Sequence, residues 1–193
     1  DGSILKDKKL LVAAEQGFGD NIQFIRYLPL VKQKFGEVIL ECKKELLKLF
    51  ENFPGVDMVV EAKNNVVPDI DFDFYVPLMS LPKLFHTNIT NIPNNIPYLK
   101  ANKTLPEEIK PLFKTNNLKV GVVWAGSPLQ DNDKKRSVAF EKFKILNKIQ
   151  GVDLFSLQKG KDSQQLNDPK IIDLSPNIND FADTAAIIEN LDL

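Results

Sequence analysis

The pattern of apolar and polar positions changes its period along this chain, and each change marks a predicted element. Residues 10–14 are continuously apolar and predict a buried strand. Residues 21–28 then carry apolar side chains at 22, 25 and 28, which is the spacing of a helix. Between them lie two glycines, so the pattern predicts a strand, a tight turn and a helix start. Apolar runs predict three further strands at 38–41, 56–60 and 72–76.

Helical spacing recurs between these strands. Leucines and Phe50 supply an apolar side to residues 43–50, and a shorter helix is expected at 77–85. We expect Pro29 to bend the first helix or shift its register, and Gly36 to end it. An alternation of strands and helices favours a parallel sheet with helices on its faces.

A second series of elements follows a polar break at residues 115–117. A helix is predicted at 106–113, before the break. Ser137 is placed to cap a helix at 138–149, and Asp180 to begin the last helix at 181–190. Apolar runs after the break predict strands at 119–124, 152–157 and 171–174.

The chain therefore reads as two α/β domains in tandem, residues 1–115 and residues 116–193. The first has enough strands for a complete Rossmann-like sheet. The second has two or three, which is few for a stable sheet. We expect the chain to be a fragment of a longer protein whose second domain continues.

Composition narrows the classes of function. The net charge of −1 disfavours a nucleic-acid partner. The chain has one cysteine, Cys42, and one histidine, His86, so no Cys- or His-based metal site is expected. No apolar run is long enough for a transmembrane segment. A single cysteine fits a reducing compartment, and we expect a cytoplasmic location.

The turn after the first strand carries the first candidate chemistry. Gly17 and Gly19 are expected to allow positive φ and the close approach of a ligand. Asp20 and Asn21 stand where the turn becomes a helix, whose free N–H groups favour polar or anionic ligands. Asp20 is interpreted either as an N-cap or as a functional carboxylate.

The second candidate site is the loop at 125–136. It joins Ser127 to the cations Lys134, Lys135 and Arg136 before a helix, a set that suits a pyrophosphate, although a solvated basic turn has the same composition. Gln158 and Lys159 end the next strand and are expected at the same edge of the sheet. Asp131 and Asp133 have metal-ligand spacing, but no further carboxylate completes a calcium loop, so no metal is expected.

Four stretches resemble one family in the same order along the chain. They are residues 15–20 (Glu-Gln-Gly-Phe-Gly-Asp), 119–128, 156–160 and 180–185. Together they resemble the glycosyltransferase region of bacterial tetratricopeptide-repeat (TPR) proteins. That region is similar to the ADP-heptose:lipopolysaccharide heptosyltransferase family and, more distantly, to O-GlcNAc transferase.

The resemblance implies a GT-B fold, in which two Rossmann-like domains face each other across a cleft. It implies that the first domain binds the acceptor and the second a nucleotide-sugar donor, without a metal or other cofactor. By this resemblance Asp20 is the catalytic base, Ser127, Lys135 and Arg136 bind the donor phosphates, and Gln158 and Lys159 contact the nucleotide. His86, with Gly17, Gly19 and Asn21, is a candidate on the acceptor side.

Two other interpretations stay open. Glu41 ends the second strand, where a ribose-binding acid of an NAD enzyme falls, but Ile22 replaces the third glycine of that fingerprint. A catalytically degenerate scaffold domain would need none of these side chains. The sugar, the nucleotide and the acceptor, whether glycan, lipid-linked or protein, do not follow from the sequence.

Overall fold

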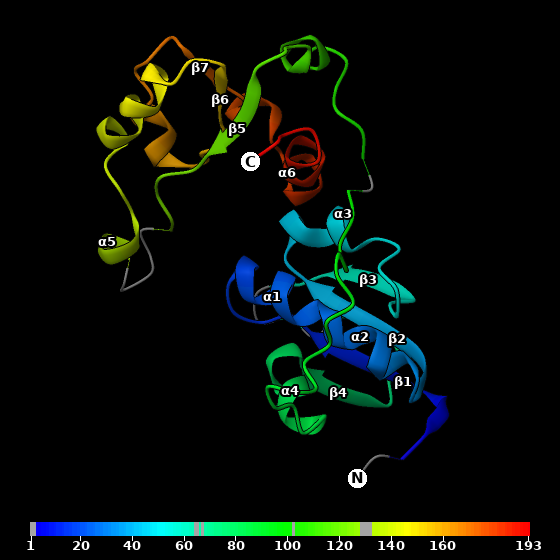
Figure 1. Ribbon diagram of the computed structural model, residues 1–193. Helices are drawn as coiled ribbons and strands as arrows, with labels where there is room; N and C mark the ends of the chain where they lie inside the picture. Colours follow the sequence, from blue (N-terminus) through cyan, green and yellow to red (C-terminus); the bar gives the residue numbers. More distant parts are fainter. Residues whose placement is uncertain (1–2, 64–65, 67, 102, 128–132) are drawn as a thin grey trace. The chain divides into compact units, whose positions relative to one another are not determined.

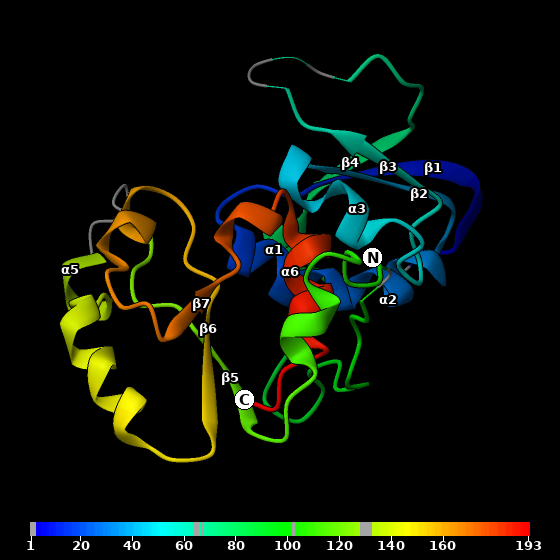
Figure 2. The same cartoon turned by 90° about the horizontal axis from the view of Figure 1, so that it is seen from above.

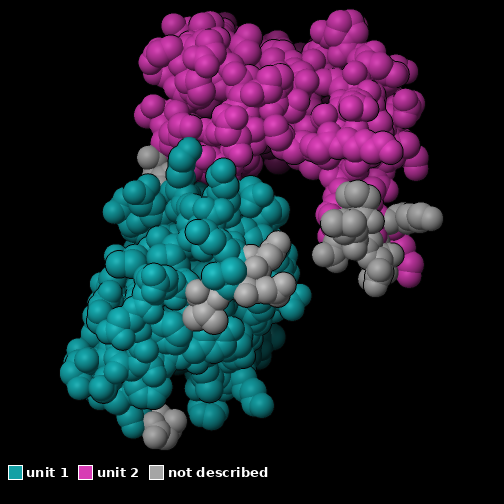
Figure 3. Space-filling view, turned by 180° about the vertical axis from the view of Figure 1, so that it is seen from behind, with its two compact units in different colours: residues 1–100 teal, residues 101–193 magenta. Residues whose placement is uncertain are grey.

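The computed structural model describes residues 3–63, 66, 68–101, 103–127 and 133–193. The chain divides into two compact units, residues 1–100 and residues 101–193, which are coloured separately in Figure 3. Each unit holds one parallel sheet, so the predicted mixed α/β class is confirmed.

Unit 1 contains a four-stranded parallel sheet in the order β3-β2-β1-β4 (Figure 1). The central strands are the most apolar, and residues 10–12 of β1 and 38–40 of β2 are buried. Cys42 ends β2 as a fully buried thiol. The strands are β1 (Leu5–Ala13), β2 (Phe35–Cys42), β3 (Met58–Glu61) and β4 (Phe74–Pro77).

The helical segments of unit 1 are short and alternate between α and 3-10 geometry. The first helix breaks before Pro29, which stands in the first turn of a new α-helix, as the predicted bend requires. The segments are α1 (Phe18–Phe24), η1 (Ile25–Tyr27), α2 (Leu28–Lys32), η2 (Lys44–Leu46), α3 (Leu47–Phe50), η3 (Leu78–Ser80) and α4 (Leu81–Leu84).

Gly36 corrects a sequence prediction. It does not end the helix but lies inside β2, beside an irregularity of the β1–β2 pairing. A Cβ built on Gly36 would overlap the carbonyl oxygen of Lys6, so glycine is required because the neighbouring backbone passes through that space.

Unit 2 contains a three-stranded parallel sheet in the order β5-β6-β7. The strands are β5 (Leu118–Val122), β6 (Val152–Ser156) and β7 (Ile171–Asp173). Helical segments surround them, most with 3-10 geometry: η4 (Lys110–Phe113), α5 (Asp133–Arg136), η5 (Phe140–Lys148), η6 (Lys161–Gln165), η7 (Ser175–Asn177) and α6 (Phe181–Ile188).

Both faces of this sheet are covered, as is usual for a parallel sheet. On one face Trp124 packs on Phe140, with ring centroids 4.8 Å apart, over Leu154. On the other face α6 packs on Phe155 and Leu157.

Residues 101–115 belong to unit 2, whereas the sequence pattern places the boundary at 115/116. Leu105 and Ile109 are buried in the core beneath α6, and Phe113 stacks on Phe155 at 4.9 Å. The segment that leads into the first strand of unit 2 therefore completes its core, and the polar break is a surface turn.

The helix predicted at 138–149 is a 3-10 helix that begins after Ala139, and Ser137 does not cap it. The Ser137 hydroxyl instead accepts a hydrogen bond from Gly126 N at 3.0 Å and donates to Asp133 Oδ1 at 2.8 Å. By contrast, Asp180 caps α6 as predicted, accepting a hydrogen bond from Asp183 N at 3.0 Å.

Candidate functional site

The strand order of unit 1 places a topological switch point at β1. From β1 the chain proceeds outward to β2 and β3, then returns to β4 on the other side of β1. In open parallel sheets the connections from two such strands diverge at their carboxyl ends and leave a crevice there, where ligands bind. The turn at 14–20 leaves β1 at that point, so the topology and the sequence motif select the same edge.

Glu15 joins the two sides of the switch point. Its carboxylate accepts hydrogen bonds from Leu78 N at 3.0 Å and Met79 N at 3.3 Å, the first amides of η3 after β4. Because these amides have no partner within their own helix, the carboxylate satisfies them and holds the turn against η3. The sequence motif contained Glu15, but its spacing gave no sign of this role.

Asp20 stands at the third position of α1, not at the N-cap position that one of the two sequence interpretations gave it. Its Oδ2 accepts a hydrogen bond from Gly17 N at 3.1 Å, so it stabilises the helix start, but Gly17 rather than Asp20 is the N-cap residue. Its side chain is half-buried, and Oδ1 has no partner among the described residues. Within the part of the chain that the structure describes, one carboxylate oxygen is therefore held by a hydrogen bond and the other is not.

The glycines of the turn act differently from the prediction. Gly17 has φ −79°, and neither Gly17 nor Gly19 is among the positive-φ residues; Gln16 takes that conformation, at φ 73°. A Cβ on Gly17 would lie 3.0 Å from Asp20 Oδ2, whereas one on Gly19 meets nothing within 4 Å. Gly17 therefore makes room for the carboxylate, and the fold places no demand on Gly19.

Asn21 is fully buried directly behind this turn. Its Nδ2 donates to the carbonyl oxygen of Ala14 at 3.3 Å, which ties α1 to the end of β1. Its Oδ1 has no hydrogen-bond partner among the described residues. A buried acceptor without a donor is costly, so such an atom in a native fold calls for a specific explanation, such as a bound water or ligand.

Lys43, which no sequence pattern singled out, lies over the same turn from the end of β2. Its Nζ donates to the carbonyl oxygen of Gln16 at 2.7 Å and lies 5.1 Å from the centre of the Phe18 ring. The left-handed Gln16 exposes the carbonyl that Lys43 binds, so only the folded turn reveals this contact.

His86 is not brought to this turn by any interaction among the described residues. It is exposed beyond the end of α4 with φ 49°, and its N–H donates to the Lys83 carbonyl. Its neighbours Phe85 and Thr87 contact Tyr27 of η1, by ring stacking at 6.2 Å and a hydrogen bond at 3.1 Å.

In unit 2, Gln158 organises the loop that leaves β5. The side chain is 3% exposed, and its Oε1 accepts hydrogen bonds from Trp124 N at 3.0 Å and Ala125 N at 2.9 Å. Its Nε2 donates to the carbonyl oxygens of Ala125 at 3.1 Å and Lys159 at 2.9 Å. All the hydrogen-bonding groups of the amide thus bind the backbone, and Gln158 fixes the loop shape.

Arg136 returns to the same loop from α5. It pairs with Asp133, Nε to Oδ1 at 3.5 Å, and its side chain is 55% exposed. A Cβ on Gly126 would lie 2.5 Å from Arg136 Nη2 and 2.8 Å from Asp133 Oδ1. Glycine at 126 therefore allows the guanidinium to lie against the loop backbone while staying open to solvent.

The remaining predicted donor-side residues surround this loop. Ser127 and Lys135 are exposed, and Lys159 donates from Nζ to the Ser175 carbonyl at 2.9 Å. Asp131 and the side chain of Lys134 lie outside the described residues. Within the described ranges, no three His, Cys, Asp or Glu side chains gather closely enough to hold a metal.

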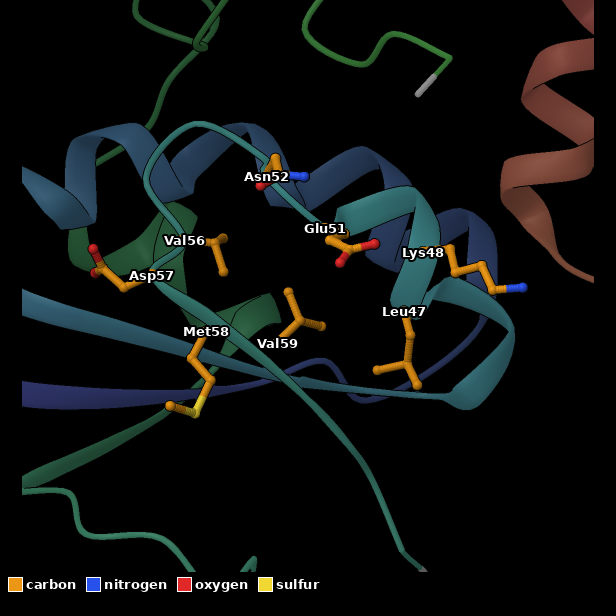
Figure 4. Close-up of a pocket in the computed structure, with 8 residues that line it drawn as sticks. All are labelled: Leu47, Lys48, Glu51, Asn52, Val56, Asp57, Met58 and Val59. Carbon is orange, nitrogen blue, oxygen red and sulfur yellow. The ribbon is translucent and has the colours of Figure 1, made fainter. Parts of the chain in front are cut away.

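Glu41, the acid on which the NAD interpretation depends, is half-buried at the end of β2. Burial raises the pKa of its carboxyl above the ordinary value. A groove of about 480 Å³ lies elsewhere in unit 1, between α3 and β3 (Figure 4). None of the predicted site residues lines this groove, whose walls include Leu47, Val56 and Val59.

Comparisons with protein families, with curated protein sequences and with solved structures find no significant match to this chain. In the part of the chain that the structure describes, no helix combines the length and apolarity needed to cross a bilayer.

Proposed function

We propose that this chain belongs to a metal-independent glycosyltransferase of GT-B type, which transfers a sugar with inversion from a nucleoside-diphosphate donor to an acceptor hydroxyl. The observation that carries the proposal is the position of the Asp20 carboxylate and its hydrogen bonding. It is a half-buried carboxylate at the switch-point end of β1, with Oδ2 held by Gly17 N and Oδ1 without a partner among the described residues.

Asp20 acts as the general base in this proposal. Oδ1 accepts the proton of the acceptor hydroxyl while the acceptor oxygen forms a bond to the anomeric carbon of the sugar. On the opposite face, the bond from that carbon to the donor phosphate oxygen breaks, and the nucleoside diphosphate leaves with the bonding electrons. The hydrogen bond from Gly17 N keeps the carboxylate in one rotamer throughout.

Unit 2 supplies the groups that stabilise the departing diphosphate. Arg136 is exposed where it lies against Gly126, and its planar guanidinium can bind two phosphate oxygens at once. Ser127 and Lys135 are exposed around the same loop. In a site without a metal, these cations take over the neutralisation of negative charge on the leaving group.

The test is a donor screen on the natural full-length polypeptide, with release of nucleoside diphosphate as the readout. ADP-, UDP- and GDP-linked sugars are the donors. We expect Asp20→Asn to lower kcat at least 100-fold with little change in donor KM, because the amide oxygen still accepts from Gly17 N but has no basicity. Turnover at the wild-type rate in Asp20→Asn would remove Asp20 from this role.

Arg136→Gln is the matched variant on the donor side. We expect it to raise donor KM and to lower kcat, since a ground-state and a transition-state contact to phosphate are both lost. If Arg136→Gln altered neither donor KM nor kcat, the diphosphate of the donor would not bind at Arg136. Lys170→Ala serves as the control, because Lys170 is exposed just before β7 and so lies at the opposite edge of the parallel sheet from the loop that follows β5.

A further inference from the structure

The peptide group between Gln16 and Gly17 is bound at both ends by charged side chains. Its carbonyl oxygen, which belongs to Gln16, accepts a hydrogen bond from Lys43 Nζ at 2.7 Å. Its N–H, which belongs to Gly17, donates to Asp20 Oδ2 at 3.1 Å. Lys43 and Asp20 therefore bind the same peptide group, the ammonium at its oxygen and the carboxylate at its nitrogen.

These two hydrogen bonds depend on one orientation, because a peptide group is rigid. Its atoms lie in one plane, and in a trans peptide the C=O and N–H bonds point in opposite directions. A rotation that takes the oxygen away from Lys43 therefore also turns the N–H away from Asp20. Polarisation acts in the same sense, since a cation at the carbonyl oxygen makes the N–H of the same group a stronger donor.

The backbone just before this peptide is strained. Gln16 has φ 73°, a left-handed conformation that residues other than glycine rarely adopt. A residue keeps such a conformation only where its surroundings hold it there. The Lys43 ammonium binds the carbonyl that this conformation exposes, so it opposes the relaxation of Gln16.

Lys43 itself stands on a fixed base. It follows Cys42, the fully buried last residue of β2, and its carbonyl accepts from Leu46 N at 2.9 Å where η2 begins. The Ala14 N–H, just before the turn, donates to the Glu41 carbonyl at 2.8 Å, so the ends of β1 and β2 are tied together. In Figure 1 and in Figure 2 the cyan segment after β2 lies close to the blue start of α1.

We propose that Lys43 is a positioning residue for Asp20. It orients the Gln16–Gly17 peptide, and the N–H of that peptide holds Oδ2 so that Oδ1 is presented to the acceptor hydroxyl. The kinetic consequence rests on the proposed function, whereas the effect on the peptide and on the Asp20 side chain does not. Lys43 contacts neither sugar nor nucleotide in this proposal and is not a catalytic residue.

The first measurement is NMR of the chain without substrate. Lys43→Met removes the ammonium and keeps a side chain of similar shape. We expect it to speed exchange of the Gly17 amide at least about threefold, and to average the three-bond couplings that report the χ1 rotamer of Asp20. The Asn21 amide, which donates to the Gly17 carbonyl at 3.1 Å, is the internal reference and should keep its exchange rate.

The second measurement is turnover by the natural full-length polypeptide. We expect Lys43→Met to lower kcat about tenfold and to leave donor KM within about twofold, because the base is misoriented while unit 2 is unchanged. Lys43→Arg should recover most of the rate, since a guanidinium can donate to the same carbonyl. Added to Asp20→Asn, Lys43→Met should cause no further loss of kcat, because a residue that acts through Asp20 then has no base to orient.

Lys44→Met is the matched control. Lys44 is the next residue along the chain and is also exposed, but it has no hydrogen bond or ion pair among the described residues. This substitution should change neither the exchange of the Gly17 amide nor kcat.

Three results would overturn the positioning role. The first is an unchanged Gly17 exchange rate and Asp20 rotamer in Lys43→Met. The second is equal acceleration of the Gly17 and Asn21 amides, which would mean that Lys43 stabilises the whole helix start. The third is an additive loss of kcat in the double variant, which would mean that Lys43 acts on the substrate directly. If the NMR changes appear but Asp20→Asn turns over at the wild-type rate, Lys43 does position Asp20 and the proposed function is wrong.

Discussion

Replacing Gln158 by alanine should destabilise unit 2 by more than the loss of one hydrogen bond, because the side-chain amide makes four hydrogen bonds to the backbone. The substitution leaves the N–H groups of Trp124 and Ala125 and the carbonyls of Ala125 and Lys159 without their partner. An unsatisfied buried polar group costs about 1–3 kcal/mol, and the Trp124 amide is the most deeply buried of the four. Allowing for water at the more exposed groups, we expect a loss of about 3 kcal/mol.

Urea unfolding followed by fluorescence reports this loss for unit 2 alone. Trp124 is the sole tryptophan of the chain and lies in unit 2, whereas the three tyrosines, Tyr27, Tyr75 and Tyr98, lie in unit 1. The matched control is Lys159→Ala, which removes one exposed hydrogen bond and should cost less than about 1 kcal/mol. If Gln158→Ala lowered the free energy of unfolding by less than about 1 kcal/mol, with an unchanged m-value, Gln158 would not be fixing the loop in the way described.

Further predictions concern single side chains. Burial alone would raise the pKa of Asp183, but hydrogen bonds from Lys103 and Asn179 outweigh it and lower the pKa. The contribution of Asp183 to the stability of unit 2 is therefore present above the pKa of the unfolded state and is lost as pH falls through the pKa of the folded state. Asp183→Asn should therefore flatten the acid side of the unit 2 stability curve, measured by urea titrations between about pH 5 and pH 2; an unchanged slope contradicts this. Gly36→Ala should destabilise unit 1 by about 2 kcal/mol in thermal melts, because the Lys6 backbone has to move. Gly19→Ala is the matched control and should be neutral or slightly stabilising, because its Cβ meets nothing within 4 Å. Equal effects of the two substitutions on stability would contradict this prediction. Glu15→Gln should cost about 1 kcal/mol, since one of two acceptors for the η3 amides is lost, and a denaturation midpoint equal to wild type argues against that clamp.

All the predicted strands are present, and the central strands β1 and β2 carry the most continuous runs of buried apolar residues, as strands inside a parallel sheet usually do. The helices were harder to predict. Residues 140–148 keep an apolar side but form a 3-10 helix, since Phe140 and Phe143 are held against Trp124 and override the local preference. Gly36 reads as a helix end in sequence, and only the passage of Lys6 beside it shows its role.

The candidate site was predictable where it is local. Gly17 and Asp20 are three residues apart, so the motif itself contains their contact. The clamps made by Glu15 and Gln158 join residues 63 and 33 positions apart, and no short pattern encodes such a distance. Sequence therefore indicated where the turns lie, while the side chains that hold them in shape depend on the strand order.

Because Cys42 is buried, the rate at which its thiol reacts can report how often unit 1 opens. Burial, with a smaller effect of the Glu41 charge, raises the pKa of the thiol to about 12 from 9.0, so the reactive thiolate is roughly a thousandfold scarcer than in an unfolded chain at the same pH. An alkylating reagent should therefore modify the native protein only during excursions that release the end of β2. The labelling rate then measures how often this sheet opens, independently of any ligand or activity.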